Sequence, residues 1–387
     1  MRIILIGPTY PFRGGISHYT TLLFRCLKKR HETTFISFSR QYPQFLFPGK
    51  TDIDPSEEQI REEGLLPLID SMNPFTWVNA ALKIVRDRAD LVILPWWVSF
   101  WAPQFWIIST LVNHFSKTKI LYICHNLVEH ESKWVDKILT RFVLKTGDFF
   151  IVHSAEDQQN LLSMIPGAEV RTTFHPTYEV FNFGPSDPDV VRKKHDLQGN
   201  VILFFGFVRE YKGLRYLIEA LPQVLSKIEV TLLVVGEFWG DKDKYLRLIK
   251  DKDVESAVVV VDKYVPNEEI RSYFSAADLV VQPYISATGS GVIQTAFGFD
   301  KPVIATKVGS LPEVIEDGKT GYLVPPRDPD ELAQAILRFF REQKSEEFIN
   351  NIKKEQHRFS WETMVAVIES LVVNYHADRN NRKILDQ

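Results

Sequence analysis

Cysteine is almost absent from this sequence, with only Cys26 and Cys124 among 387 residues. Neither lies at a spacing typical of zinc binding, and two distant thiols in apolar stretches exclude a disulfide framework as the basis of the fold. This usage favours reduced, buried thiols in a cytoplasmic protein.

An excess of positive charge is also missing, because the formal net charge is −3. A protein without basic excess has little with which to neutralise phosphates, so no nucleic-acid partner is expected. No GxGxxG follows a predicted strand and no GxxxxGK[ST] occurs. The first absence argues against a nicotinamide dehydrogenase, and the second leaves no P-loop signature.

The longest uncharged run covers residues 91–115, which contain no Asp, Glu, Lys or Arg and are long enough to span a bilayer. Pro95, Pro103 and several polar side chains interrupt this run. We therefore predict a buried strand over 91–94 and a helix over about 102–115. Half of the eight tryptophans crowd this segment, either as core packing or facing a lipid interface or a sugar ring; they are Trp96, Trp97, Trp101 and Trp106.

Strand-like and helix-like runs alternate along the chain, which predicts an α/β fold with doubly wound sheets. The length exceeds one ordinary core, so two domains are expected. We place a first domain at 1–180, a linker at 181–199, a second domain at 200–357 and a terminal helical segment at 358–387. Residues 40–66 are rich in Pro, Gln and acids and are predicted to form an irregular surface insertion or a mobile loop.

The octet from Gly206 to Gly213 is the most informative motif. It follows an apolar strand at 201–205, precedes a helix with apolar spacing, and contains Arg209 and Lys212 between two glycines. Two cations at the carboxyl end of a strand, beside a helix N-terminus, suit a diphosphate. The alternative interpretation is a solvated basic turn.

Two other loops have the same character. Gly14 and Gly15 follow the first strand and open a helix, which allows close approach of a ligand to free backbone amides. Small and hydroxyl residues open another helix after the strand 279–282, namely Thr288, Gly289, Ser290 and Gly291. Each loop taken alone is also compatible with a plain strand-to-helix turn.

Polar side chains gather after the buried strand 120–124, at His125, Asn126, His130 and Glu131. Ligands bind at the carboxyl ends of strands in such sheets. This cluster is therefore a candidate for sugar or acceptor contacts, although a lone histidine is more often structural.

Together with the octet, the sequence at residues 301–315 and 317–325 resembles that of retaining GT-B glycosyltransferases of family 4. The resemblance spans nearly the whole chain and is dense over 201–330. It implies GT-B architecture, in which two Rossmann-like domains face a cleft and a C-terminal helix crosses back to the first domain. It also implies a retaining hexosyl- or glycosyltransferase that moves a sugar from a nucleoside-diphosphate sugar to a hydroxyl acceptor.

The resemblance further implies roles for particular residues. Arg209 and Lys212 would stabilise the leaving diphosphate, and His125 would contact the donor sugar. Asn126, His130 and Glu131 are weaker candidates for sugar or acceptor contacts. Glu313 would orient the phosphate-site loops. The remaining donor-binding candidates are Gly14, Gly15, Gly206, Thr288, Gly289, Ser290, Gly291 and Gln294.

One departure from the family concerns its paired glutamates, whose places fall at Ala287 and Thr295. Thr288, Ser290 or Gln294 are candidates to replace them. The loss leaves two alternatives open, namely a catalytically weak GT-B subunit that binds nucleotide or a partner without transfer, and a nucleotide-sugar epimerase.

No metal or cofactor is expected, because none of the Asp-x-Asp pairs follows a buried strand and most of them adjoin prolines or helix starts, as capping acids do. The expected partners are a nucleotide-sugar donor and a glycan or lipid-linked acceptor, which suits polysaccharide biosynthesis. Peripheral contact with the inner face of the membrane stays an open alternative, because the sequence has a tryptophan-rich segment and the basic run Lys28-Lys29-Arg30. The sequence does not specify the base, the sugar or the acceptor.

Overall fold

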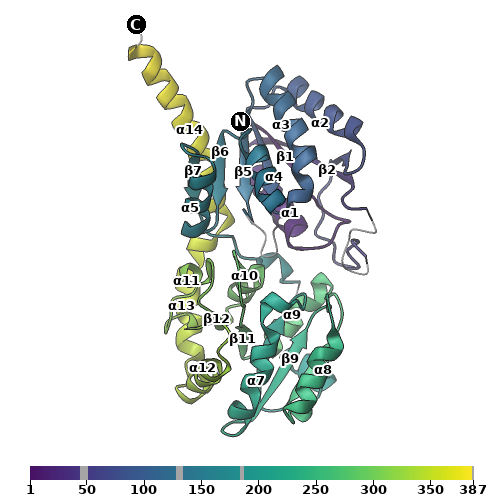
Figure 1. The fold of residues 1–387 in the computed structure, drawn as a ribbon, viewed down its shortest axis with the longest axis vertical. Helices are drawn as coiled ribbons and strands as arrows, with labels where there is room; N and C mark the ends of the chain where they lie inside the picture. The colour runs from purple at the N-terminus through teal and green to yellow at the C-terminus, as the bar shows by residue number, and fades with distance from the viewer. Residues whose placement is uncertain (44–50, 128–133, 184–186, 386–387) are drawn as a thin grey trace.

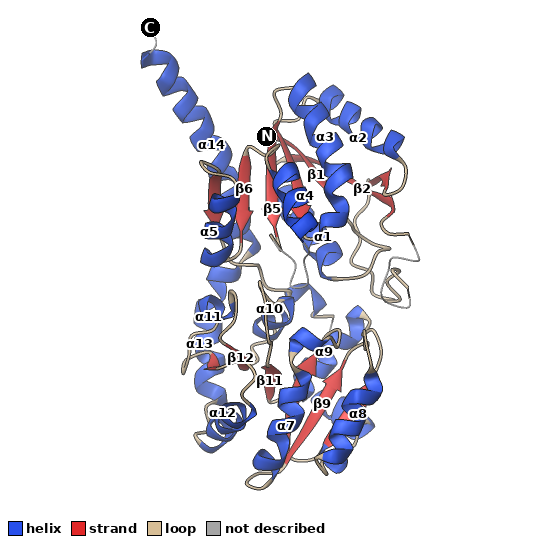
Figure 2. Cartoon of the chain, viewed as in Figure 1, coloured by secondary structure: helices blue, strands red, loops and turns tan. Residues whose placement is uncertain are grey.

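The computed structural model describes residues 1–43, 51–127, 134–183 and 187–385. Two parallel sheets of seven and six strands lie one above the other, each covered by helices (Figure 1). Figure 2 shows the alternation of strand and helix in both halves. The predicted α/β class and the GT-B arrangement of two Rossmann-like halves are confirmed.

The first sheet has the order β3-β2-β1-β4-β5-β6-β7. The chain moves outward from β1 to β3 and then crosses back to β4, so β1 and β4 flank the switch point at which ligands bind in such sheets. Apolar runs buried on both faces form the central strands. The strands are β1 (Arg2–Ile6), β2 (Glu32–Arg40), β3 (Leu66–Asp70), β4 (Leu91–Trp96), β5 (Lys119–Cys124), β6 (Phe149–Val152) and β7 (Glu169–Thr172).

Helices cover both faces of this sheet. They are α1 (Gly15–Leu27), α2 (Pro74–Asp87), η2 (Ser99–Trp101), α3 (Ala102–Phe115), α4 (Trp134–Leu144) and α5 (Ala155–Met164). On one face, Tyr19 and Leu23 of α1 share a core with Met364 and Ile368 of the terminal helix α14 (Trp361–Leu385). The predicted return of the C-terminal helix to the first domain is thereby confirmed, and it is visible in Figure 1.

The second sheet has the order β10-β9-β8-β11-β12-β13, with its switch point between β8 and β11. Its strands are β8 (Asn200–Phe205), β9 (Val230–Val235), β10 (Val258–Val261), β11 (Leu279–Gln282), β12 (Val303–Thr306) and β13 (Gly321–Val324). The helices of this half are η3 (Glu179–Phe181), α6 (Pro188–Lys194), η4 (Glu210–Lys212), α7 (Leu214–Leu225), α8 (Lys242–Asp251), η5 (Glu255–Ala257), α9 (Asn267–Ala276), α10 (Gly291–Gly298), α11 (Leu311–Val314), α12 (Pro329–Arg341), α13 (Ser345–Glu355) and η6 (Gln356–Phe359).

The connection at 40–66 includes, in the part that the structure describes, an irregular segment that is exposed on one side and contacts both domains. Residues 51–63, which we call the interdomain strap, pass from the first domain to the second. Ser56 and Ile60 are each only 4% exposed. The hydroxyl of Ser56 accepts a hydrogen bond from the backbone N–H of Asn267 at 2.9 Å, at the start of α9. The prediction of an irregular segment is confirmed for these residues, since they form no helix or strand. The prediction did not foresee that their buried polar side chains bond to another domain.

The uncharged run at 91–115 forms β4, η2 and α3, close to the predicted strand and helix. Trp96 and Trp101 are buried in the core of the first domain. The indole N–H groups of Trp97 and Trp101 donate to the Tyr42 hydroxyl at 3.1 and 3.3 Å. Of the cluster's two interpretations, core packing applies to Trp96 and Trp101. Within the described ranges, no helix combines the length and apolarity needed to cross a bilayer.

Candidate functional site

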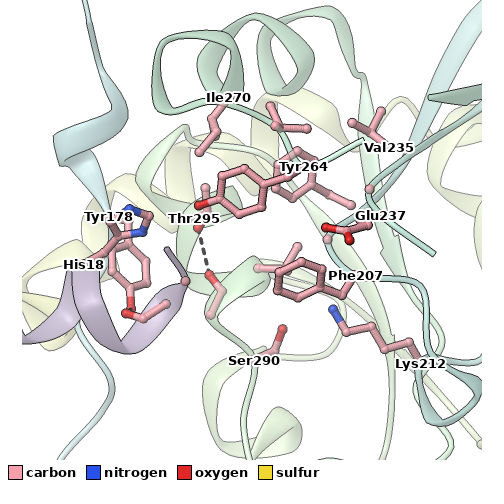
Figure 3. Close-up of a pocket in the computed structure, with 18 of the residues that line it drawn as sticks. His18, Tyr178, Phe207, Lys212, Val235, Glu237, Tyr264, Ile270, Ser290 and Thr295 are labelled. Carbon is pink, nitrogen blue, oxygen red and sulfur yellow. Dashed lines mark hydrogen bonds between the residues drawn. The ribbon is translucent and has the colours of Figure 1, made fainter. Parts of the chain in front are cut away.

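A cavity of about 270 Å³ lies where the carboxyl ends of the two sheets meet (Figure 3). Both domains line it, because α1 contributes from one side and the loops after β8, β9, β10 and β11 contribute from the other. Its principal side chains are His18, Tyr178, Phe207, Lys212, Glu237, Tyr264, Ile270, Tyr284, Ser290 and Thr295.

Lys212 and Lys263 both line this cavity. Lys263 is paired with Glu269 at 2.6 Å, so Lys212 is the lining cation to consider as an anion site. Its side chain is only 7% exposed, and its ammonium nitrogen lies 5.9 Å from the centre of the Tyr284 ring. Burial, assisted by the nearby Arg209 guanidinium, lowers the pKa of Lys212 to about 8. None of the described carboxylates forms an ion pair with it. Lys212 is therefore a desolvated positive charge without a protein counter-ion in the described structure, which favours binding of an anion.

Two helix N-termini point to the same cavity. Helix α1 begins at Gly15, and α10 begins at Gly291, with the Ser290 hydroxyl capping the backbone N–H of Ile293 at 3.3 Å. Gly14, Gly15, Gly289, Ser290 and Gly291 all line the cavity. The free amides and the helix dipoles add partial positive charge on the sides that Lys212 does not reach.

Close approach of backbone segments explains the second glycine of the octet. Gly213 has φ +72°, and a Cβ atom there would lie 1.9 Å from the carbonyl oxygen of Pro283. The turn after Lys212 therefore packs directly on the loop that leads to α10. Only glycine permits this contact, which fixes Lys212 relative to Ser290.

Aromatic rings form the other end of the cavity. Phe207 and Tyr264 line it, and the Arg13 guanidinium lies over both rings, 5.7 and 4.8 Å from their centres. Arg13 also forms an ion pair with Glu237 at 2.9 Å. The two side chains are 3% and 6% exposed and come from different domains. This buried pair holds the domains together beneath the aromatic end.

The interdomain strap closes the same side of the molecule. Asn267 of α9, fully buried, donates through its side-chain amide to the carboxylate of Asp54 at 3.4 Å and to the carbonyl of Glu58 at 3.1 Å. Asp54 in turn lies 3.7 Å from His18, which lines the cavity. His18 and the Ser56 hydroxyl lower the pKa of Asp54 by hydrogen bonding and outweigh the opposing effect of its burial.

His125 lies in the first domain, behind the cavity rather than in its lining. Its ring packs edge-on against Tyr19 at 4.4 Å and lies 5.3 and 5.8 Å from the rings of His153 and His175. Burial, reinforced by these two neighbours, lowers the pKa of His125 well below its usual value, so the imidazole is neutral. Tyr178 connects this cluster with the cavity, since its hydroxyl lies 3.4 Å from His175 and donates to the carbonyl of Gly15.

The other predicted residues divide between the cavity and its surroundings. Gly206 lines the cavity, whereas Arg209 does not; its guanidinium lies over the rings of Tyr211 and Trp239. Gln294 is buried and does not line the cavity. His130 and Glu131 lie outside the described residues.

Three predicted residues form contacts between the domains instead. The Thr288 hydroxyl donates to the side-chain oxygen of Asn126. The Glu313 carboxylate accepts from the backbone N–H of Ala155 at 3.0 and 3.2 Å, at the start of α5. These contacts hold the loop before α10 and the helix α11 against the first domain, so their effect on the cavity is indirect.

The two places of the family's glutamate pair differ in their surroundings. Ala287 is buried in the core of the second domain. Thr295 lines the cavity, but its hydroxyl donates to the Gly291 carbonyl of its own helix at 2.8 Å (Figure 3). Neither residue supplies a carboxylate to the cavity.

The residues that the structure describes contain no group of three His, Cys, Asp or Glu side chains able to hold a metal ion. Three of the Asp-x-Asp pairs begin with a helix cap, as expected. Their first members are Asp187, Asp241 and Asp328, whose carboxylates accept from the backbone N–H groups of α6, α8 and α12.

Sequence reasoning missed the aromatic end, His18, Glu237 and the strap. Arg13 adjoins the predicted Gly14-Gly15 turn, but its partner Glu237 lies in the other domain and carries no local signal. One sequence signal could have identified this part of the site. The run Tyr264-Val265-Pro266-Asn267 follows β10 and joins the end of a strand to the start of a helix, where ligands bind in such sheets.

Comparison with known proteins shows what the chain is similar to. Residues 199–342 match the family model described as glycosyl transferases group 1. An uncharacterized glycosyltransferase of Methanocaldococcus jannaschii is 31% identical over 42% of this chain and 42% of its own length. A D-inositol 3-phosphate glycosyltransferase of Corynebacterium glutamicum is 23% identical over 75% of this chain and 73% of its own length. The chain spans less than half the length of the first curated relatives it matches.

Solved structures share the whole architecture. Sucrose-phosphate synthase from Thermosynechococcus elongatus superposes with a TM-score of 0.70 at 20% identity, over 97% of this chain and 99% of that one. Anabaena HepE in complex with UDP has a TM-score of 0.72 at 18% identity, over 97% and 100%. The chain is therefore a protein of the GT-B class. Within that class it resembles glycosyltransferase family 4, and its residues 199–342 carry the group 1 glycosyltransferase sequence.

Proposed function

We propose that this chain is a retaining glycosyltransferase that moves a sugar from a nucleoside-diphosphate sugar to a hydroxyl acceptor without a metal ion. The observation that carries the proposal is Lys212, a buried cation without a described carboxylate partner, facing a cavity at which two helix N-termini converge. Such a site favours a multiply charged anion, and it stabilises the negative charge that develops on a departing diphosphate.

The shape of the cavity orients the donor. The phosphates would lie at Lys212 and at the N-termini of α1 and α10, and the base would lie against Phe207 and Tyr264 at the aromatic end. The UDP complex of the structurally similar Anabaena HepE supports a nucleotide in a fold of this kind.

Transfer then requires little additional protein chemistry. The bond from the anomeric carbon to the diphosphate oxygen breaks, and the acceptor oxygen forms the new bond on the same side of the sugar. The departing phosphate takes the acceptor proton, so no dedicated base is required. The acceptor, a glycan or a lipid-linked glycan, would approach from the first domain, where Asn126 lies at the domain boundary.

Release of nucleoside diphosphate, measured with the purified chain over UDP-, GDP- and ADP-sugars, tests the proposal. Turnover should persist in excess chelator, and Lys212→Ala should lower it about 10²-fold or more, the usual effect of removing one preorganised charge donor. Activity abolished by chelator and restored by manganese or magnesium would contradict metal independence. Normal turnover in Lys212→Ala would show that the diphosphate binds elsewhere.

The second candidate function is a catalytically weak GT-B subunit, favoured by the absence of carboxylates at Ala287 and Thr295. Such a subunit would bind a nucleoside diphosphate at Lys212 but release none from any donor. Measuring nucleotide affinity by calorimetry beside the release assay separates the two candidates.

A further inference from the structure

Exposed apolar side chains concentrate on one side of the first domain. Nine of the fifteen large hydrophobic side chains that are exposed in the described structure belong to α2, to α3, to α4 or to the turn before α2. These helices neighbour one another on the outer side of the first sheet (Figure 1). We call this surface the α2–α4 surface; its members are Met72, Phe75, Val78, Leu82, Phe115, Trp134, Val135, Ile138 and Phe142.

Helix α4 contributes a row of exposed apolar side chains to this surface. Trp134 is 74% exposed and Ile138 is 56% exposed. Phe142, one turn further, stacks on Trp106 of α3 at 5.0 Å, so the apolar row continues onto the neighbouring helix. A monomeric soluble protein rarely exposes a contiguous row of this kind unless it contacts a partner or a membrane.

The charges beside this row are positive. Lys137 and Arg141 are exposed on α4, and Lys145 is exposed directly after its end; the three are spaced one turn apart in the sequence. The only acid of α4, Asp136, accepts a hydrogen bond from the Ser99 hydroxyl at 2.7 Å. On α2, Asp87 is paired with Lys83 at 2.8 Å. Helix α3 contains no charged residue.

We propose that the α2–α4 surface is a docking surface for an anionic lipid bilayer, with Trp134, Ile138 and Phe142 entering the interface and the cations of α4 on the lipid headgroups. Exposed aromatic and aliphatic side chains beside lysine and arginine are the composition of helices that lie in a membrane interface. The basic residues Lys28 and Arg30 do not serve this purpose, because they pair with Glu62 and Glu369.

The location suits an acceptor that is held in a membrane. Helix α4 follows β5 in the chain, and Asn126, just after β5, contacts Thr288 across the domain boundary. This last point rests on the proposed function, whereas lipid binding does not.

Co-sedimentation of the full chain with vesicles tests the docking surface. We expect binding to phosphatidylcholine vesicles that contain phosphatidylglycerol and much weaker binding to phosphatidylcholine alone. The double substitution Lys137→Gln/Arg141→Gln should lower partitioning about 30-fold, because each cation near an anionic surface contributes roughly a factor of five. Trp134→Ser/Ile138→Ser should lower it at least about 10-fold through lost apolar burial.

The matched control is Leu246→Ser/Lys250→Gln on α8, which removes an exposed apolar residue and a cation from the second domain. It should bind as the wild type does. Equal binding by the α4 variants and the wild type would overturn the proposal, and so would equal binding to both vesicle types. A wild-type dimer that Trp134→Ser/Ile138→Ser dissociates would make the surface a protein contact instead. If the serine variant fails to fold, the glutamine variant still decides.

Discussion

Replacing Lys212 with methionine should stabilise the protein while removing its ligand affinity. Methionine keeps the apolar stem of the side chain but not its charge. Burial lowers the pKa of Lys212 from 10.5 to about 8, and each pKa unit corresponds to about 1.4 kcal/mol. Folding with a protonated Lys212 at pH 7 therefore costs about 3 kcal/mol, which Lys212→Met removes.

The size of this effect depends on pH. The pKa of Lys212 is lower in the folded than in the unfolded state, so the cost is complete below pH 8. It diminishes as the pH rises from 8 to 10.5, and above that value lysine is neutral in both states. Lys212→Met should therefore raise the melting temperature by several degrees at pH 7 and by little above pH 10.5.

Ligand binding should change in the opposite direction. Losing one charge-assisted contact with the diphosphate costs roughly 1.5–3 kcal/mol, or about 10- to 100-fold in affinity. Differential scanning calorimetry and titration with UDP, GDP and ADP measure the two effects on one variant. Lys250→Met on the exposed side of α8 is the control, with a stability change of about 0.5 kcal/mol or less. A destabilised Lys212→Met that binds nucleotide normally would refute the reasoning.

Three further substitutions test other parts of the site. Arg209→Ala should raise the pKa of Lys212 and shift the alkaline limit of activity upward, because the Arg209 guanidinium lowers that pKa from outside the cavity lining; an unchanged pH profile would show that the two residues do not interact. His125→Ala should lower the free energy of unfolding by about 1–3 kcal/mol through lost packing on Tyr19, while nucleotide affinity persists; a stable variant with strongly reduced transfer would instead indicate sugar contact. Glu237→Gln should destabilise the protein by roughly 3–5 kcal/mol, because Arg13 keeps a buried charge, and Arg13→Met/Glu237→Leu should recover most of the loss in a thermal melt.

The sequence predicted the sheets well because their strands are apolar on both faces. Leu279–Gln282 was predicted with its observed bounds, and the strands predicted at 120–124 and 201–205 each begin one residue earlier in the structure. The edge strand β3 was missed for two reasons. Pro67 argues against a strand, and the polar residues 51–65 before it made the whole segment look like a connection. Proline is tolerated there since β3 has a neighbour on one side only.

The end of the cavity at Lys212 was predictable and the aromatic end was not. Lys212, Gly15 and Ser290 each follow a strand or open a helix, so local pattern identified them. Arg13 and Glu237 meet only when two domains close, and the strap reaches Asn267 from another domain. Contacts of this kind depend on tertiary arrangement, which one sequence without its fold does not display. His125 is the opposite case. Its position after a strand predicted a contact with the ligand, but its neighbours Tyr19 and His153 bury the ring.

The distribution of charge around the cavity indicates which step the missing glutamates affect. The groups that would stabilise a departing diphosphate, Lys212 and the amides of α1 and α10, do not depend on Ala287 or Thr295. Carboxylates at those two places would recognise neutral hydroxyls, and their loss removes hydrogen-bond acceptors, not positive charge. Discrimination among hydroxyl patterns arises from buried polar groups that a wrong ligand leaves unpaired. The chain should therefore retain affinity for nucleoside diphosphates while distinguishing less sharply among donor sugars, unless Glu237 or backbone carbonyls supply the acceptors.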